Sequence, residues 1–220
     1  MLRACIFLLS FVFIAAAQTS RTVQASGSAT ITVTPDQASI DVGVITTATT
    51  AQDSAQQNAT QTTGVLNAVK AVLGANGTVQ TLYYSVSPRY APNTSTISGY
   101  TTNNTLRVVT TDLSIIGRLI DAANGAGANT VGGLSFGLQN HETYVEQALT
   151  AATKQALAHA GAIAGGLGGK VGSVVSAQEG SSYSPILIGG PTGAVGATTT
   201  PVQTGTVNVY ATVILVVQLQ

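Results

Sequence analysis

The chain has 220 residues, of which only 7% are charged, with eight Lys and Arg residues against eight Asp and Glu residues. Removal of Arg3 with an N-terminal leader would leave seven basic and eight acidic residues. Nucleic-acid binding depends on clustered Lys and Arg, so this composition excludes a nucleic-acid partner. Surfaces of such low net charge tend to associate.

The first 17 residues have the layout of a secretory signal peptide. Arg3 supplies a positive charge, residues 4–14 are almost entirely apolar, and residues 15–17 are three alanines. The apolar run is shorter than the about 20 residues that a membrane-spanning helix needs. We expect cleavage after Ala17, which also removes the single cysteine, Cys5. The exported chain then depends on a hydrophobic core and not on disulfides.

Residues 18–28 are small and polar, which predicts a flexible leader. The alternating stretches on either side of Pro35-Asp36 predict an antiparallel hairpin. The Thr50-x-x-Asp53 spacing is that of a capping box, which predicts the start of the first helix. The predicted strands cover residues 29–34, 38–44, 79–86, 105–111, 130–138, 171–179 and 207–219, and the predicted helices cover residues 51–73, 113–123 and 142–167.

The first and the third predicted helix each show one stripe of mostly apolar or small residues at helical spacing. The stripe of the first helix contains Ala55, Ala59, Thr62, Leu66, Val69 and Leu73, and that of the third contains Val145, Leu149, Ala152, Ala156, Ala160, Ile163 and Leu167.

Two segments are predicted to be irregular, and one strand is predicted to be central. Residues 89–104 are expected to form a broad turn, and residues 180–205 a long loop of the length that usually marks function or disorder. Residues 207–219 are β-branched and apolar, which is typical of a buried strand. The order of the elements predicts an α+β domain over residues 29–220, with a mostly antiparallel mixed sheet and about three helices packed on it.

Several landmarks, taken in order and spacing, resemble the SIMPL-domain (DUF541) family over almost the whole exported chain. One departure is that Gln203 and Thr206 stand where that family carries glutamate near its closing strand. The landmarks are residues 27–43, residues 81–90 with Ser85-Val86-Ser87-Pro88-Arg89-Tyr90, Gly99-Tyr100, Asp112-Leu113, Ala148-Leu149 and residues 201–205 before the last strand.

The resemblance implies an exported bacterial protein without established catalytic residues. Members include periplasmic immunogenic proteins described as outer-membrane-associated, and some assemble into ring- or channel-like oligomers. We therefore expect a non-enzymatic periplasmic module that works by homo-oligomerisation, linked to envelope stress and without a cofactor. The alternatives are a ligand- or peptide-binding protein that uses residues 180–205 as a lid, and an outer-membrane-associated, pore-like assembly.

One motif matches a nucleophile elbow, because residues 133–137 read Gly-Leu-Ser-Phe-Gly around Ser135. Glu146 and His159 would complete the order of a catalytic triad. The motif is predicted to lie inside a strand, however, and no helix follows Ser135 directly. A glycine-rich strand is the favoured interpretation, and we assign no catalytic residue.

The remaining motifs give no metal or phosphate site. His141 and His159 are 18 residues apart, about 27 Å along one helix, so they cannot share a metal ion. Residues 165–170 lack the P-loop pattern and instead predict the end of a helix. A last group of residues suits either a protein interface or cross-strand packing, and both interpretations stay open: Tyr83, Tyr84, Tyr90 and Tyr100.

Overall fold

The computed structural model describes residues 21–187 and 199–220, so the predicted signal peptide and its cleavage site lie outside the described residues. Within them, three α-helices and two antiparallel sheets confirm the predicted α+β class. The elements are β1 (Thr22–Val33), β2 (Gln37–Ala48), α1 (Ala51–Leu73), β3 (Gly77–Tyr90), β4 (Ile97–Thr110), the 3-10 turn η1 (Leu113–Ile115), α2 (Ile116–Gly125), β5 (Thr130–Gly137), α3 (His141–Gly166), β6 (Val171–Tyr183), β7 (Ile186–Leu187) and β8 (Val207–Leu219).

The five-stranded sheet has the strand order β3-β4-β2-β5-β7 and carries α1 and α2 on one face. The predicted cap of α1 is confirmed, because the Asp53 amide donates to Thr50 Oγ1 at 3.1 Å. Asp112 caps the next helical segment by accepting from the Ser114 amide at 3.0 Å. The core between sheet and helices is aliphatic, with Phe136 as its one buried aromatic ring.

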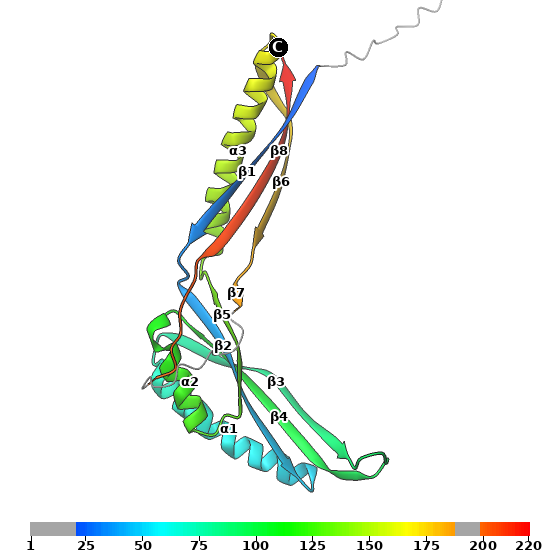
Figure 1. Ribbon diagram of the computed structural model, residues 1–220, viewed down its shortest axis with the longest axis vertical. Coiled ribbons are helices and arrows are strands. Elements are labelled where there is room, and N and C mark those ends of the chain that lie inside the picture. Colours follow the sequence, from blue (N-terminus) through cyan, green and yellow to red (C-terminus); the bar gives the residue numbers. More distant parts are fainter. Residues whose placement is uncertain (1–20, 188–198) are drawn as a thin grey trace, which may run out of the picture.

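The three-stranded sheet has the order β1-β8-β6 and carries α3 on one face. Figure 1 shows this sheet with α3 forming one half of an elongated molecule, and the five-stranded sheet with α1 and α2 forming the other half. The last strand, β8, lies in the centre with every second residue buried, which confirms its predicted central position.

The predicted hairpin of the first two strands is wrong, because β1 and β2 belong to different sheets. The chain passes from one half of the molecule to the other at residues 34–36. Asp36 fixes this passage: its amide donates to the Gly137 carbonyl at 3.1 Å, and its carboxylate accepts from the Gln139 amide at 2.7 Å. β1 pairs instead with β8 along its whole length, from Thr22 opposite Gln218 to Val33 opposite Val207.

Three predicted boundaries also need correction. The flexible leader is shorter than predicted, since β1 begins at Thr22 and residues 22–28 are paired with β8. The broad turn at 89–104 is only residues 91–96, because β3 and β4 continue to pair through Tyr90 and Ile97. The loop predicted at 180–205 begins with the end of β6 and with β7, and residues 188–198 of it lie outside the described residues.

The buried stripe of α3 is narrower than its sequence pattern predicts. Ile163 and Leu167 are exposed, because Ile163 lies outside the every-fourth-residue repeat that faces the sheet and Leu167 follows the last residue of α3. The stripe that does contact the sheet repeats at every fourth residue and has no exposed area: Ala148, Ala152, Ala156, Ala160 and Ala164.

Small side chains let α3 approach the backbone of β1 very closely. A Cβ atom built at Gly27 would lie 2.1 Å from the Ala152 carbonyl oxygen and 2.5 Å from the Ala156 nitrogen. Real Cβ atoms do not come so near to backbone atoms, so the position requires glycine. Gly27 and the alanine stripe therefore fix the distance between α3 and the three-stranded sheet.

We predict that Gly27→Ala lowers the free energy of unfolding by about 1–3 kcal/mol, the usual cost of overpacking a well-packed core. The matched control is Gly161→Ala on α3, where an added Cβ meets nothing within 4 Å. That change should be neutral or stabilise the protein by up to about 1 kcal/mol through helix propensity. Urea unfolding followed by circular dichroism measures both, and equal effects would contradict this account of the contact.

Candidate interaction surface

The structure does not bring the three candidate residues of a catalytic triad together: Ser135, Glu146 and His159. Ser135 lies in β5, where its hydroxyl is 2.8 Å from the Ser39 hydroxyl. Glu146 and His159 are 13 residues apart on α3, which separates them by about 20 Å. Gly133 has a φ of +61° beside a register shift opposite Asp41, so this glycine of the motif serves a bend in β5.

His159 has a structural position at the edge of the three-stranded sheet. Its Nδ1 atom lies 2.7 Å from the Ser26 carbonyl oxygen, and the Ser28 amide donates to Gln155 Oε1 at 2.6 Å. Both backbone groups belong to β1, an edge strand. Side chains of α3 therefore occupy hydrogen-bonding positions that an edge strand otherwise offers to another chain.

His141 and the glycines at 165–169 also have structural positions. His141 stacks on Tyr183 with ring centroids 4.9 Å apart, and in residues 21–187 and 199–220 no three His, Cys, Asp or Glu side chains are grouped to hold a metal ion. The glycines at 165–169 end α3, as predicted, and lead into β6. Gly168 has a φ of +77° at this point.

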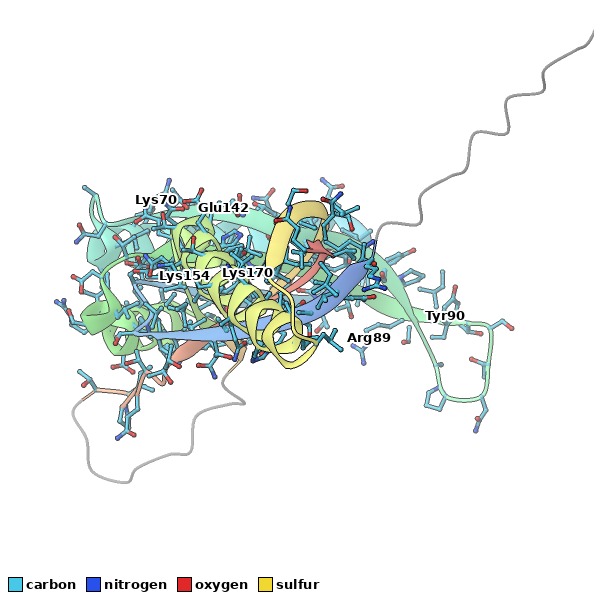
Figure 2. All side chains as sticks on the ribbon, turned by 90° about the horizontal axis from the view of Figure 1, so that it is seen from above. Lys70, Arg89, Tyr90, Glu142, Lys154 and Lys170 are labelled. Carbon is cyan, nitrogen blue, oxygen red and sulfur yellow. The ribbon has the colours of Figure 1, made fainter. Side chains whose placement is uncertain are left out.

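Of the four tyrosines noted in the sequence, three are exposed: Tyr83, Tyr84 and Tyr90. We call residues 82–97, the turn end of the β3–β4 hairpin, the arm; Figure 2 shows it reaching away from the rest of the molecule, with Arg89 and Tyr90 near its end. Tyr100 is half-buried. Six large apolar or aromatic side chains of the arm are between 36% and 57% exposed: Leu82, Tyr83, Tyr84, Val86, Tyr90 and Ile97.

A buried polar cluster explains why α1 leaves the arm uncovered. Asn58, which has no exposed area, donates from Nδ2 to the carbonyl oxygens of Val44 at 2.8 Å and Thr102 at 3.2 Å. The Ser54 hydroxyl bonds to Thr102 Oγ1 at 2.8 Å and to the Thr46 carbonyl at 3.2 Å. These bonds hold the N-terminal half of α1 over β2 and β4, and not over β3.

The sequence pattern does not predict this cluster, because its members are polar. The predicted stripe through Ala55, Ala59 and Leu66 is wrong at those positions, which are half-buried or exposed. The side chains that α1 buries are Ser54, Asn58, Thr62, Val65, Val69 and Leu73. An Asn and a Ser four residues apart, in line with Val65 and Val69, were the available signal.

The faces of the arm follow from strand register, because directly opposed residues in an antiparallel pair share a face. Val86 lies opposite Thr102, on the α1 side of the sheet. Tyr83 lies opposite Thr105, on the other side. The arm therefore presents apolar side chains on both of its faces.

The arm carries a single charged side chain, Arg89, and no carboxylate. The next cation along the hairpin, Arg107, is held by Asp41 through two hydrogen bonds of 2.8 Å each. The hydrogen bond to Asp41 raises the pKa of Arg107 above its ordinary value, so this guanidinium stays charged at physiological pH. A partner of the arm has to match a surface that is apolar and nearly uncharged.

The free edge of β3 is protected against simple strand addition. The register with β4 shifts between Thr81 and Tyr83, and Pro88 has no N–H group to donate. A bulge and a proline are both recognised ways of blunting an edge strand. The arm therefore offers its side chains, and not a long regular backbone edge, to a partner.

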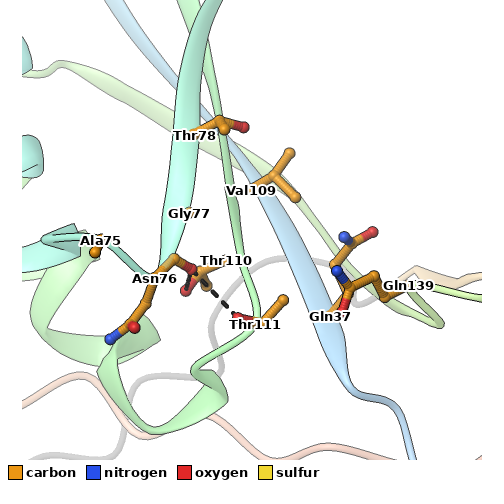
Figure 3. Close-up of a pocket in the computed structure, with 9 residues that line it drawn as sticks. All are labelled: Gln37, Ala75, Asn76, Gly77, Thr78, Val109, Thr110, Thr111 and Gln139. Atoms are coloured by element: carbon orange, nitrogen blue, oxygen red, sulfur yellow. Dashed lines mark hydrogen bonds between the residues drawn. The ribbon is translucent and has the colours of Figure 1, made fainter.

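A shallow cavity of about 290 Å³ lies at the end of the five-stranded sheet, and its side chains carry hydroxyl and amide groups but no charge. Figure 3 shows Asn76 beside Thr110 and Thr111, from which its carbonyl oxygen accepts hydrogen bonds. The cavity offers a ligand only neutral hydrogen-bonding groups. Its lining is Gln37, Ala75, Asn76, Gly77, Thr78, Val109, Thr110, Thr111 and Gln139.

The C-terminal end of the predicted loop, residues 199–205, is anchored to α2. The Thr200 amide and hydroxyl donate to the Asp121 carboxylate at 3.2 and 2.7 Å. Val202 packs on the core of the five-stranded sheet. A lid over residues 180–205 is thus tied down at this end.

The architecture defines an α+β protein of two antiparallel sheets whose halves are joined end to end. The chain belongs to the SIMPL family, described as a protein of unknown function (DUF541), whose profile matches residues 23–217. The family resemblance is therefore confirmed. In the described part of the chain, no helix has the length and apolar character needed to cross a membrane.

The chain is also similar to individual proteins over most of its own length. The chain is 27% identical over 164 residues to the 26 kDa periplasmic immunogenic protein of Brucella melitensis, a match that covers 71% of this chain and 66% of that one. It is 29% identical over 168 residues to the uncharacterized protein YggE of Escherichia coli K12, covering 73% of this chain and 66% of the relative. The match thus spans slightly less than two thirds of the length of each relative.

We predict that Tyr84→Ser changes the free energy of unfolding by less than about 0.5 kcal/mol, as is usual for surface substitutions. Asn58→Ala should instead cost about 2–4 kcal/mol, because it removes two buried hydrogen bonds and leaves a cavity at a position with no exposed area. Urea unfolding measures both variants. A large loss for Tyr84→Ser would mean that the tyrosines of the arm serve packing within the chain.

Proposed function

We propose that this protein is exported to the periplasm and acts there without catalysis, as an interaction module that self-associates through the arm. The observation that carries the proposal is the group of six exposed apolar and aromatic side chains on residues 82–97. Monomeric proteins seldom expose such side chains as a contiguous group, and larger patches mark interaction sites. A named relative that is periplasmic supports the location.

A second copy of the chain is the partner that best fits the arm. Homodimer interfaces are more apolar than other interfaces and contain few charges in their centre. The arm, with three exposed tyrosines and one charge, has that composition. Tyrosine is also enriched among the residues that contribute most to binding.

The positions of Ser135 and His159 support the proposal that the protein acts without catalysis. Ser135 bonds to Ser39, and His159 lies against the Ser26 carbonyl in the other half of the molecule. Neither arrangement places a base beside a nucleophile, as nucleophilic catalysis requires.

The test is the mass of the exported chain, residues 18–220, measured by size-exclusion chromatography with light scattering over a wide range of concentrations. We expect the mass to rise with concentration. The triple variant Leu82→Ser, Tyr84→Ser, Tyr90→Ser should weaken association at least about tenfold, because truncated interface residues of this kind often cost more than 1 kcal/mol each.

The matched control is the double variant Val174→Ser, Val175→Ser, which removes equally exposed apolar side chains from β6. We expect it to associate like the unaltered chain. A chain that stays monomeric at the highest attainable concentration would overturn the proposal, as would association that is lost in the β6 variant and kept in the arm variant.

A further inference from the structure

The two described ends of the chain meet at one end of the molecule, far from the arm (Figure 1). The Leu219 amide donates to the Arg21 carbonyl at 2.8 Å, and the Gln220 amide donates to the Lys170 carbonyl at 2.9 Å. These bonds join the start of β1, the end of β8 and the segment between α3 and β6. We call this end the terminal tip and define it as Arg21, Ile163, Leu167, Lys170, Val174, Val175 and residues 219–220.

The terminal tip exposes apolar side chains that nothing within the chain covers. Leu167, just after the end of α3, is 65% exposed, the largest exposure of any large apolar side chain in the described residues. Val174 and Val175 on β6 are also more than half exposed. They are uncovered because α3 lies mainly over β1 and β8, so that the outer strand β6 extends beyond it.

The charged side chains at this tip are basic. Arg21 and Lys170 are both exposed there. The one carboxylate side chain on the three strands is Glu179, which lies opposite Val213. That position is six residues before Leu219, about 20 Å along the strand. The terminal tip therefore combines exposed aliphatic side chains with two cationic ones. The carboxylate side chain of Glu179 lies well away from it.

The length of the chain that precedes Arg21 is a second argument for the same surface. Residues 4–14 are the apolar run of the leader, and Arg21 follows Ile14 by seven positions, with six residues between them. Fully extended, seven residues span at most about 25 Å. Before the expected cleavage after Ala17, insertion of the leader in a membrane therefore holds the terminal tip within that distance of the lipid surface.

We propose that the terminal tip docks on the surface of an anionic phospholipid bilayer. Leu167, Ile163 and the two valines enter the interface between head groups and acyl chains, while Arg21 and Lys170 contact lipid phosphates. Apolar insertion combined with basic residues is how peripheral proteins bind anionic membranes. The inference rests on the export assumed in the proposed function, and it directs the arm away from the membrane, where it is free to contact a second copy.

The experiment measures co-sedimentation of residues 18–220 with vesicles of phosphatidylethanolamine and phosphatidylglycerol in a 3:1 ratio, and with phosphatidylcholine vesicles. The protein is kept at a concentration where light scattering reports a monomer, so that avidity from self-association does not contribute. We expect tighter binding to the anionic vesicles, weakened by added salt because surface electrostatics are screened.

Variants separate the apolar and the charged contributions. Ile163→Ser with Leu167→Ser should weaken binding about tenfold or more, and Lys170→Gln about fivefold, the latter only on anionic vesicles. The matched control is Leu82→Ser with Tyr84→Ser on the arm, which should bind vesicles like the unaltered chain. Urea unfolding of each variant verifies that these exposed changes leave the fold intact.

Two results would overturn the proposal. One is an absence of vesicle binding, or binding that is unaffected by the Ile163 and Leu167 changes. The other is a loss of self-association in the terminal-tip variants, which would make this end an interface between copies. Failure of the proposed function is distinguishable, since it would show as arm variants with an unaltered mass, whatever the vesicles show.

Discussion

The fully buried amide of Asn58 determines which part of the five-stranded sheet is covered. Its two hydrogen bonds to the carbonyl oxygens of Val44 and Thr102 can form only when the N-terminal half of α1 lies over β2 and β4. A buried donor of this kind loses more free energy when it is displaced than an apolar contact would, so α1 cannot shift toward β3. The exposure of Tyr84 and Val86 on the outer strand follows from that position.

The three-stranded sheet likewise has a part that is covered by a helix and a part that is exposed. α3 packs tightly where Gly27 meets the alanine stripe, and Gln155 and His159 occupy hydrogen-bonding positions along the β1 edge. The β3 edge is blunted by a register shift and by Pro88. The backbone is thus guarded against uncontrolled strand pairing, while apolar side chains remain exposed at the two ends of the molecule. Specific side-chain contacts are what such a surface can offer.

Local signals predicted the parts of this fold that depend on local physics. The cap at Thr50, the glycines that end α3 and the buried character of β8 all act within a few residues, and each is confirmed. The partner of β1 could not be predicted, because Thr22 and Gln218 are brought together only by the complete fold. Exposure of the tyrosines was equally undetermined, since an alternating strand has the same sequence pattern whether or not a helix covers it.

The most direct test of the account is the chemical accessibility of individual tyrosines, measured by nitration and mass spectrometry in dilute and in concentrated solutions of residues 18–220. Self-association through the arm predicts that Tyr83, Tyr84 and Tyr90 react readily when dilute and become protected when concentrated. Tyr210, which is exposed on the three-stranded sheet, should react equally in both. Equal reactivity of the arm tyrosines at all concentrations would contradict the account.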